Sequence, residues 1–115
     1  MLSNNLRKTK IYQMYIWKTE ELKLQIGKLF QFYRLNNKLS QLQLGNEINL
    51  SSNQVGRIER AETNPTLESL VKFCNFFKID MLHLFTKLNE EELKKIESEI
   101  DRLQKEFKNQ NKRKS

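Results

Sequence analysis

Apolar residues in the middle of this chain recur three and four positions apart, which is the spacing of one face of an α-helix. No segment alternates strictly between apolar and polar residues, and the sequence contains no internal repeat. With only 3 Gly and 1 Pro in 115 residues, the composition also suits helices better than a turn-rich β-fold. We therefore predict an all-α protein with one compact domain and short extensions.

The pattern predicts five helices between residues 22 and 88. The first should end near residues 36–37, and the fifth, which Asp80 can cap, should run from Met81 to about Leu88. The apolar faces of the first four helices contain, in chain order, Leu22, Ile26, Leu29, Phe30 and Tyr33; Leu44 and Ile48; Val55 and Ile58; and Leu67, Leu70, Val71, Cys74 and Phe77.

The central helices each begin after a residue that can cap them. Ser40 is placed to cap a helix from residue 41 to about residue 48. Ser51 can cap the next helix, with Gln54 three residues later as in a capping box. The Asn-Pro-Thr triplet at residues 64–66 then breaks the chain and caps the fourth helix. These signals set the expected helix boundaries.

A further amphipathic helix is predicted over residues 89–108, with three Glu residues in its first turn, where the helix dipole favours anions. Its apolar residues are spaced 3, 4, 3 and 4 apart, as in a coiled-coil seam of about two heptads. We expect this seam to pair with its copy in a second subunit; the alternative is that it folds back on its own domain. Residues 109–115 are polar and basic and are expected to form a disordered tail. The seam residues are Leu93, Ile96, Ile100, Leu103 and Phe107.

The formal net charge of +7 favours a polyanionic partner, with nucleic acid ahead of an acidic membrane surface. A single Cys (Cys74) and a single His (His83) allow no internal disulfide and no catalytic or metal-binding cluster. We therefore expect no metal, no cofactor and no enzyme activity, a packed Cys74 thiol, and a surface or packing role for His83. Without an apolar run of about 20 residues or a secretion signal, the expected location is the bacterial cytoplasm, at the nucleoid.

Between the second and third helices the chain must reverse within three or four residues. Asn49 occupies the position where a left-handed backbone is expected, which Asn tolerates better than any residue except Gly. Gly45 lies where the two helices should cross most closely, and Val55 and Ile58 can fill the space beneath them. Two capped helices, a tight turn and a basic outer face on the second helix predict a helix-turn-helix that presents one helix to the DNA major groove.

From about Gly27 to Leu84 the chain resembles the phage-repressor-like, or Xre/Cro-type, helix-turn-helix family. This resemblance implies a five-helix DNA-binding domain, usually dimeric, whose third helix (residues 52–60) enters the major groove. Residues 1–21 and the helix at 89–108 would then be additions to a domain at 22–88. The matching motifs are Gly27 and Arg34; Leu39-Ser40-Gln41 with Leu44; Ser51, Val55, Ile58 and Glu59; Asn64-Pro65-Thr66; and Leu67 with Leu70.

The resemblance also implies a role for individual residues. Arg34 and Glu59 would form a buried salt bridge between the first and third helices. The base-contacting positions would be Ser52, Asn53 and Arg57, and the phosphate-contacting positions Gln41, Arg60, Thr63 and Asn64. Side-chain chemistry agrees, because Arg57 can donate two hydrogen bonds to guanine and Asn53 can pair with adenine. Arg60 and Lys38 are better suited to phosphate, which adds affinity without sequence information.

Two positions depart from the family pattern. Relatives usually have Gly after the third helix, but this chain has Arg60-Ala61-Glu62, which predicts a longer helix. Gly56 is expected on the exposed face of the third helix. It would there either let the backbone approach DNA closely or simply lower helix propensity by about 1 kcal/mol.

These features predict a homodimeric, sequence-specific transcriptional regulator, more often a repressor than an activator, on a palindromic operator with half-sites about one helical turn apart. A mobile-element regulator, a restriction-modification controller and an autoregulating antitoxin all remain open within this class. The alternative is a protein-interaction adaptor that uses the same fold. Its partner would bind the apolar cluster at residues 11–17, namely Ile11, Tyr12, Met14, Tyr15, Ile16 and Trp17.

Overall fold

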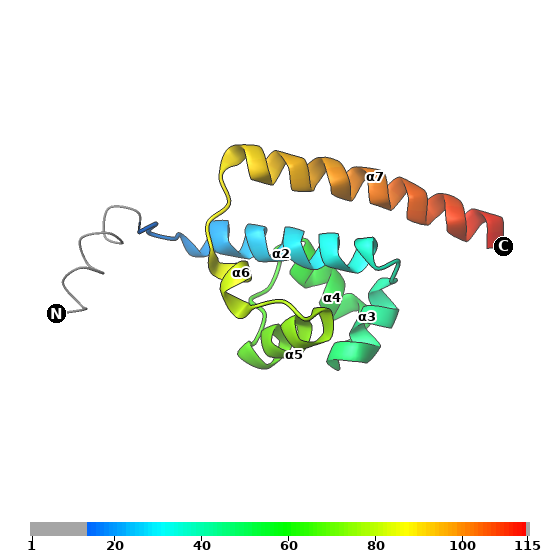
Figure 1. The fold of residues 1–115 in the computed structure, drawn as a ribbon. Coiled ribbons are helices and arrows are strands. Elements are labelled where there is room, and N and C mark those ends of the chain that lie inside the picture. The colour runs from blue at the N-terminus through cyan, green and yellow to red at the C-terminus, as the bar shows by residue number, and fades with distance from the viewer. Residues whose placement is uncertain (1–13, 115) are drawn as a thin grey trace.

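The computed structural model describes residues 14–114, and all regular structure in this range is helical (Figure 1). The predicted all-α fold is confirmed: five helices form the domain, and one long helix follows it. With the labels of Figure 1, the helices are α2 (Thr19–Asn36), α3 (Gln41–Ile48), α4 (Ser52–Glu59), α5 (Leu67–Phe77), α6 (Met81–Phe85) and α7 (Glu90–Lys114).

Both short helices α3 and α4 begin with a complete capping box. The Ser40 hydroxyl accepts a hydrogen bond from the N–H of Gln43 at 3.0 Å, and the Gln43 side chain returns to the N–H of Ser40 at 2.8 Å. Ser51 and Gln54 repeat this arrangement at 3.1 and 2.8 Å. Because the caps satisfy backbone donors that would otherwise be unpaired, these helices start where the sequence predicts.

Most of the core lies between α3–α6 and α2, which is the central helix of the molecule (Figure 1). Phe30 of α2 stacks on Phe73 of α5, with ring centroids 3.8 Å apart and planes within 5° of parallel. Leu44 of α3, Val55 of α4 and other fully buried side chains surround this pair. Cys74 is buried in the same core, as predicted, and burial raises the pKa of its thiol.

Helix α6 ends at Phe85, so the prediction that it runs to about Leu88 is wrong. The reason is the buried side chain of Gln25 on α2. Its amide nitrogen donates to the carbonyls of Leu84 at 3.1 Å and Thr86 at 2.8 Å, and its oxygen accepts from the N–H of Leu88 at 3.0 Å. These backbone groups are therefore bonded to α2 instead of extending α6.

Helix α7 runs beside α2 in the same direction, on the side away from α3–α6 (Figure 1). Ile100 is buried, Leu93 and Ile96 pack against the core, and Lys28 forms an ion pair with Glu97 at 3.1 Å. Within the single chain the seam thus follows the fold-back alternative. In residues 14–114 no helix is both long enough and apolar enough to cross a membrane.

The backbone of α7 remains helical to Lys114, so the prediction of a disordered tail from residue 109 is wrong for residues 109–114. Once a helix has formed, each added residue contributes another hydrogen bond, and this segment contains no Gly or Pro to stop it. The acidic start and basic end of α7 also complement the helix dipole.

The part of the apolar cluster that the structure describes, residues 14–17, precedes α2 without regular structure, and Ile11 and Tyr12 lie outside the described residues. Tyr15 donates a hydrogen bond to Glu21, and its ring packs edge-on against Trp17 at 5.0 Å. The Lys87 ammonium lies 5.3 Å from the centre of the Tyr15 ring. This segment is therefore attached to the beginning of α2 through Tyr15.

Candidate nucleic-acid interface

The turn between α3 and α4 has the predicted left-handed residue at Asn49, with φ 60° and ψ 47°. A Cβ atom on Gly45 would lie 2.2 Å from the carbonyl oxygen of Leu50. The closest approach at Gly45 is therefore to the backbone of the turn, rather than to the next helix as the sequence suggests. No side chain fits there, and this fixes how tightly α4 folds back on α3.

A buried ion pair fastens the end of α4 to α2. Nε of Arg34 lies 2.6 Å from Oε2 of Glu59, and Nη2 lies 3.0 Å from Oε1. Only 7% and 3% of these two side chains are exposed. Arg34 also donates to the carbonyl of Leu39 at 2.9 Å, so one guanidinium holds α2, α4 and the segment before α3. This is the pair that the family resemblance implies.

Helices α2 and α4 also approach each other through backbone. A Cβ atom on Gly27 would lie 2.6 Å from the carbonyl oxygen of Ile58. From α3, the amide nitrogen of Gln41 donates to Oε1 of Glu59 at 3.1 Å. Helix α4 is thus held from two sides, and its orientation depends on packing and polar contacts together.

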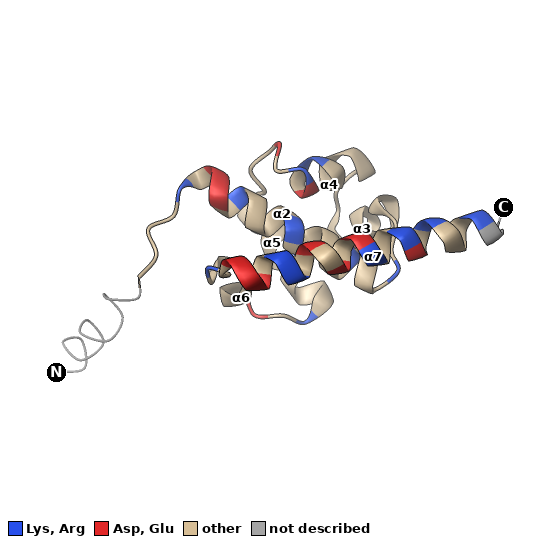
Figure 2. Ribbon diagram, turned by 90° about the horizontal axis from the view of Figure 1, so that it is seen from above, with Lys and Arg blue, Asp and Glu red and all other residues tan. Residues whose placement is uncertain are grey.

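The outer face of α4 carries the residues expected to contact bases. Asn53 and Arg57 are exposed and four positions apart, so they lie on the same side of the helix, whereas Val55 and Ile58 are buried. Ser52, at the start of the helix, is half-buried. In the view from above, α4 stands clear of α7, so the long helix does not cover it (Figure 2).

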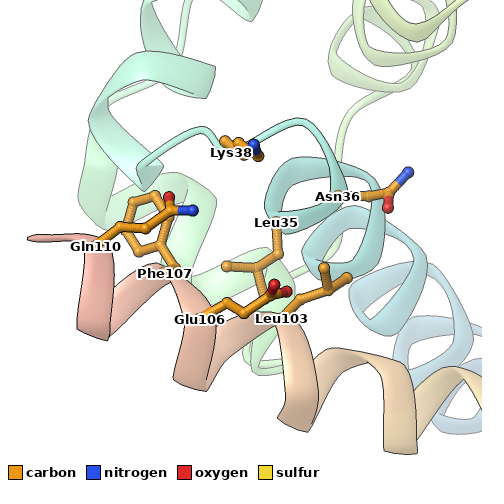
Figure 3. A pocket seen from close by; sticks show the side chains of 7 residues that line it. All are labelled: Leu35, Asn36, Lys38, Leu103, Glu106, Phe107 and Gln110. Carbon is orange, nitrogen blue, oxygen red and sulfur yellow. The ribbon is translucent and has the colours of Figure 1, made fainter.

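The residues expected to contact phosphates do not all gather in one place. Gln41 and Arg60 lie close together across α4, whereas Thr63 and Asn64 belong to the loop that leads to α5. Lys38 lies apart from them, in the loop before α3. There it borders a small hollow lined by Leu35, Asn36, Leu103, Glu106, Phe107 and Gln110, between the end of α2 and α7 (Figure 3).

Arg60 forms an exposed ion pair with Glu62, in which Nε lies 2.7 Å from Oε2 and Nη2 lies 3.3 Å from Oε1. The hydrogen bond between the two groups raises the pKa of Arg60 and lowers the pKa of Glu62. Sequence reasoning did not single out Glu62. Its place two residues after a candidate phosphate ligand is visible in the sequence, but its pairing depends on the path of the backbone.

Helix α4 ends at Glu59, so the prediction of a longer helix is wrong. Ala61 adopts a left-handed backbone with φ 58°, at the position where relatives usually have Gly. The N–H of Glu62 then bonds the carbonyl of Arg57 at 2.9 Å, and the N–H of Ala61 bonds that of Ile58 at 3.0 Å. These two bonds form a Schellman motif, whose geometry Ala accepts despite its Cβ atom.

The prediction that Gly56 lies on an exposed face is also wrong, because Gly56 is buried. A Cβ atom at this position would lie 2.9 Å from Nη1 of Arg60 and 3.2 Å from Nε2 of Gln41. Two side chains therefore cover Gly56, one from the end of α4 and one from the start of α3.

Two capped helices, joined by a left-handed Asn and fastened to a third helix by a buried ion pair, define a helix-turn-helix DNA-binding domain. Residues 31–84 match the family model described as "Helix-turn-helix". This segment is therefore a helix-turn-helix domain of the Xre/Cro type, a kind of domain that DNA-binding regulators contain. No curated protein and no solved structure matches the chain significantly.

Proposed function

We propose that this protein is a transcriptional regulator that binds double-stranded DNA sequence-specifically by inserting α4 into the major groove. Of the two possible roles, we propose repression over activation. The observation that carries this proposal is the contrast within α4. Buried contacts from Glu59, Val55 and Ile58 fix the helix, while Asn53 and Arg57 remain exposed one turn apart. A rigid helix with free polar side chains is what direct base readout requires.

In this proposal Arg57 binds a guanine edge, Asn53 binds an adenine edge, and Ser52 contacts the base pair beside the start of α4. Each well-formed contact of this kind contributes about 1–3 kcal/mol of discrimination against the wrong base. Phosphate contacts set the orientation of the domain on the duplex. They are assigned to Gln41, Lys38, Arg60, Thr63 and Asn64.

In this proposal the protein acts as a homodimer on a palindromic operator, in the cytoplasm and at the nucleoid. Ile100 is buried and the other four seam residues are half-buried. Leu93 and Ile96 pack against the core, whereas Leu103 and Phe107 border the small hollow beside Leu35. We assign the contact between two copies to this end of α7.

The experiment that tests the proposal is selection from random duplex DNA with the purified full chain at about physiological salt. A palindromic consensus is the expected result, and the spacing of its half-sites would give the distance between the two α4 helices. Repeating the selection with Arg57→Ala should leave the consensus intact except at one base position of each half-site. Binding without any consensus would contradict sequence-specific regulation.

A second candidate function is a protein-interaction adaptor. The observation that favours it is the exposure of Met14 and Ile16, of which 66% and 85% are accessible. It predicts weak DNA binding without a consensus, and loss of regulation when these two apolar side chains are replaced by Ser. The DNA selection described above therefore separates the two functions.

A further inference from the structure

Gly56 differs from the other two glycines in what surrounds it: the space that a Cβ atom would occupy is bordered by the ends of other side chains. A Cβ atom on Gly27 or Gly45 would meet a backbone carbonyl at 2.6 or 2.2 Å. At Gly56 the nearest atoms are instead the ends of two flexible side chains, Arg60 and Gln41. Both distances start from one point, so Nη1 of Arg60 and Nε2 of Gln41 are at most about 6 Å apart over α4.

Each of the two side chains keeps a hydrogen-bond donor for another partner. Arg60 uses Nε and Nη2 to bind Glu62, which leaves Nη1, the atom closest to Gly56. The amide nitrogen of Gln41 has two hydrogen atoms, and it donates one of them to Glu59 at 3.1 Å. A guanidinium and an amide that both border Gly56, each with a donor to spare, suit a tetrahedral anion such as a DNA phosphate.

The carboxylates beside these donors have different roles. Glu59 is 3% exposed and is engaged by Arg34, so it cannot leave its position to compete for Arg60. Glu62 is 48% exposed and holds Arg60 by a bidentate contact. This contact occupies Nε and Nη2 and leaves Nη1 beside Gly56 for another anion.

We propose that Gly56 is a positioning residue: because it has no side chain, Gln41 and Arg60 can lie together across α4 and bind a single DNA phosphate group. Glu62 binds Nε and Nη2 of Arg60 and so keeps the guanidinium in this place, and the phosphate binds the Nη1 that remains. The inference rests on the proposed function. According to this inference, Gly56 on the recognition helix contributes to DNA affinity but not to base readout.

The alternative is that Gly56 only weakens the helix, and Gly56→Ala separates the two possibilities. Ala has the higher helix propensity, and its methyl group would displace only flexible tips, so the variant should melt at the same temperature as the wild type or higher. DNA binding should weaken by the same factor on the selected operator and on random duplex. The slope of log affinity against log salt should fall by about one unit.

Double-mutant cycles test whether Gly56 acts through these two side chains. Gly56→Ala should cost little further affinity when Arg60→Ala and Gln41→Ala are already present. In the presence of wild-type Gly56, the double variant Arg60→Ala and Gln41→Ala should lose less DNA affinity than the product of the two single fold-losses. The reason is that the Arg60 and Gln41 side chains contact the same phosphate. Lys94→Ala, on the exposed start of α7, serves as the control for removing a cation elsewhere.

The inference is overturned if the wild type binds its operator and Gly56→Ala binds with the same affinity and salt slope. Full additivity of the Arg60 and Gln41 losses would overturn it as well. If the wild type binds no duplex DNA at any salt concentration, the proposed function fails and this inference fails with it. The behaviour of the wild type thus distinguishes the two failures.

Discussion

Arg34 and Glu59, separated by 25 positions in the chain, form a buried bidentate ion pair that joins the end of α2 to the end of α4. The same carboxylate also accepts a hydrogen bond from Gln41 at the start of α3. One glutamate therefore connects all three helices on which DNA recognition depends. Its loss should affect folding before it affects any contact with DNA.

The first prediction is that Glu59→Gln lowers the free energy of unfolding by about 3–5 kcal/mol, since it leaves the Arg34 guanidinium buried without its counter-charge. Urea denaturation measures this change. Glu68→Gln is the matched control, because Glu68 pairs with Lys72 in an exposed contact at 3.0 Å. The control should change stability by at most about 1 kcal/mol. Similar effects of the two substitutions would contradict a structural role for the buried pair.

The second prediction compares two arginines on DNA. Arg57→Ala should relax base preference at one position of each half-site, because its guanidinium reaches base edges. Arg60→Ala should weaken binding to all sequences alike and reduce the salt slope by about one unit. Titrations of cognate and random duplexes at several salt concentrations measure both effects. Equal behaviour of the two variants on both duplexes would mean that α4 is not the recognition helix.

The third prediction concerns the left-handed residue after α4. Ala61→Gly should raise the free energy of unfolding by about 1 kcal/mol, since Gly adopts a positive φ without the clash that an L-residue's Cβ atom makes. Asn46→Gly, at an exposed position inside α3, should instead lower it by about a few tenths of a kcal/mol, the difference in helix propensity between Asn and Gly. Chemical denaturation of the two variants checks the sign of each change. A destabilised Ala61→Gly protein would show that α4 ends differently.

The fourth prediction is that Gln25→Leu destabilises the protein by about 1–3 kcal/mol, because the backbone groups that Gln25 now satisfies would lose their partner. Hydrogen exchange should show the largest loss of protection at the N–H of Leu88, which bonds to Gln25 at 3.0 Å. Amides of α4 serve as the internal reference. A uniform loss of protection across the chain would argue against a local role in joining α6 to α7.

The fifth prediction follows from the buried thiol of Cys74. Burial raises its pKa in the folded state, so this group contributes stability that is complete below the unfolded pKa of about 8.5 and is lost as pH rises through the folded value. The same burial shields the thiol from reagents, so a disulfide reagent at pH 8 should modify Cys74 no faster than the protein unfolds. Measuring the rate with and without urea tests this, and rapid modification without urea would show that the thiol is accessible.

Local chemistry was enough to predict the fold and the outline of the site. Ser40, Ser51 and Asn49 each act on backbone within a few residues, so their effects can be inferred from spacing alone. The family motifs then placed the partners of the buried ion pair on their helices. None of these inferences required the position of a distant segment.

The predictions are wrong where a helix end or the burial of a residue depends on side chains that lie outside the local sequence pattern. The end of α6 depends on Gln25, about 60 positions earlier in the chain. A polar residue at an apolar position of the first helix was the available signal for it. The burial of Gly56 depends on the path of two long side chains, and the end of α4 depends on Ala61 accepting a conformation that Gly prefers. Helical spacing contains no information about such contacts.

Because α2 lies between α7 and the other helices, the folding unit includes the whole of α2. The segment that matches the family model begins at residue 31, inside α2, and it excludes Leu29 and Phe30, which are among the most deeply buried side chains. A fragment limited to residues 31–84 would keep α4 but lose two thirds of α2, the helix against which α4 packs. The folding unit therefore extends beyond the matched segment, and substitutions at Leu29 or Phe30 should abolish DNA binding by unfolding the domain.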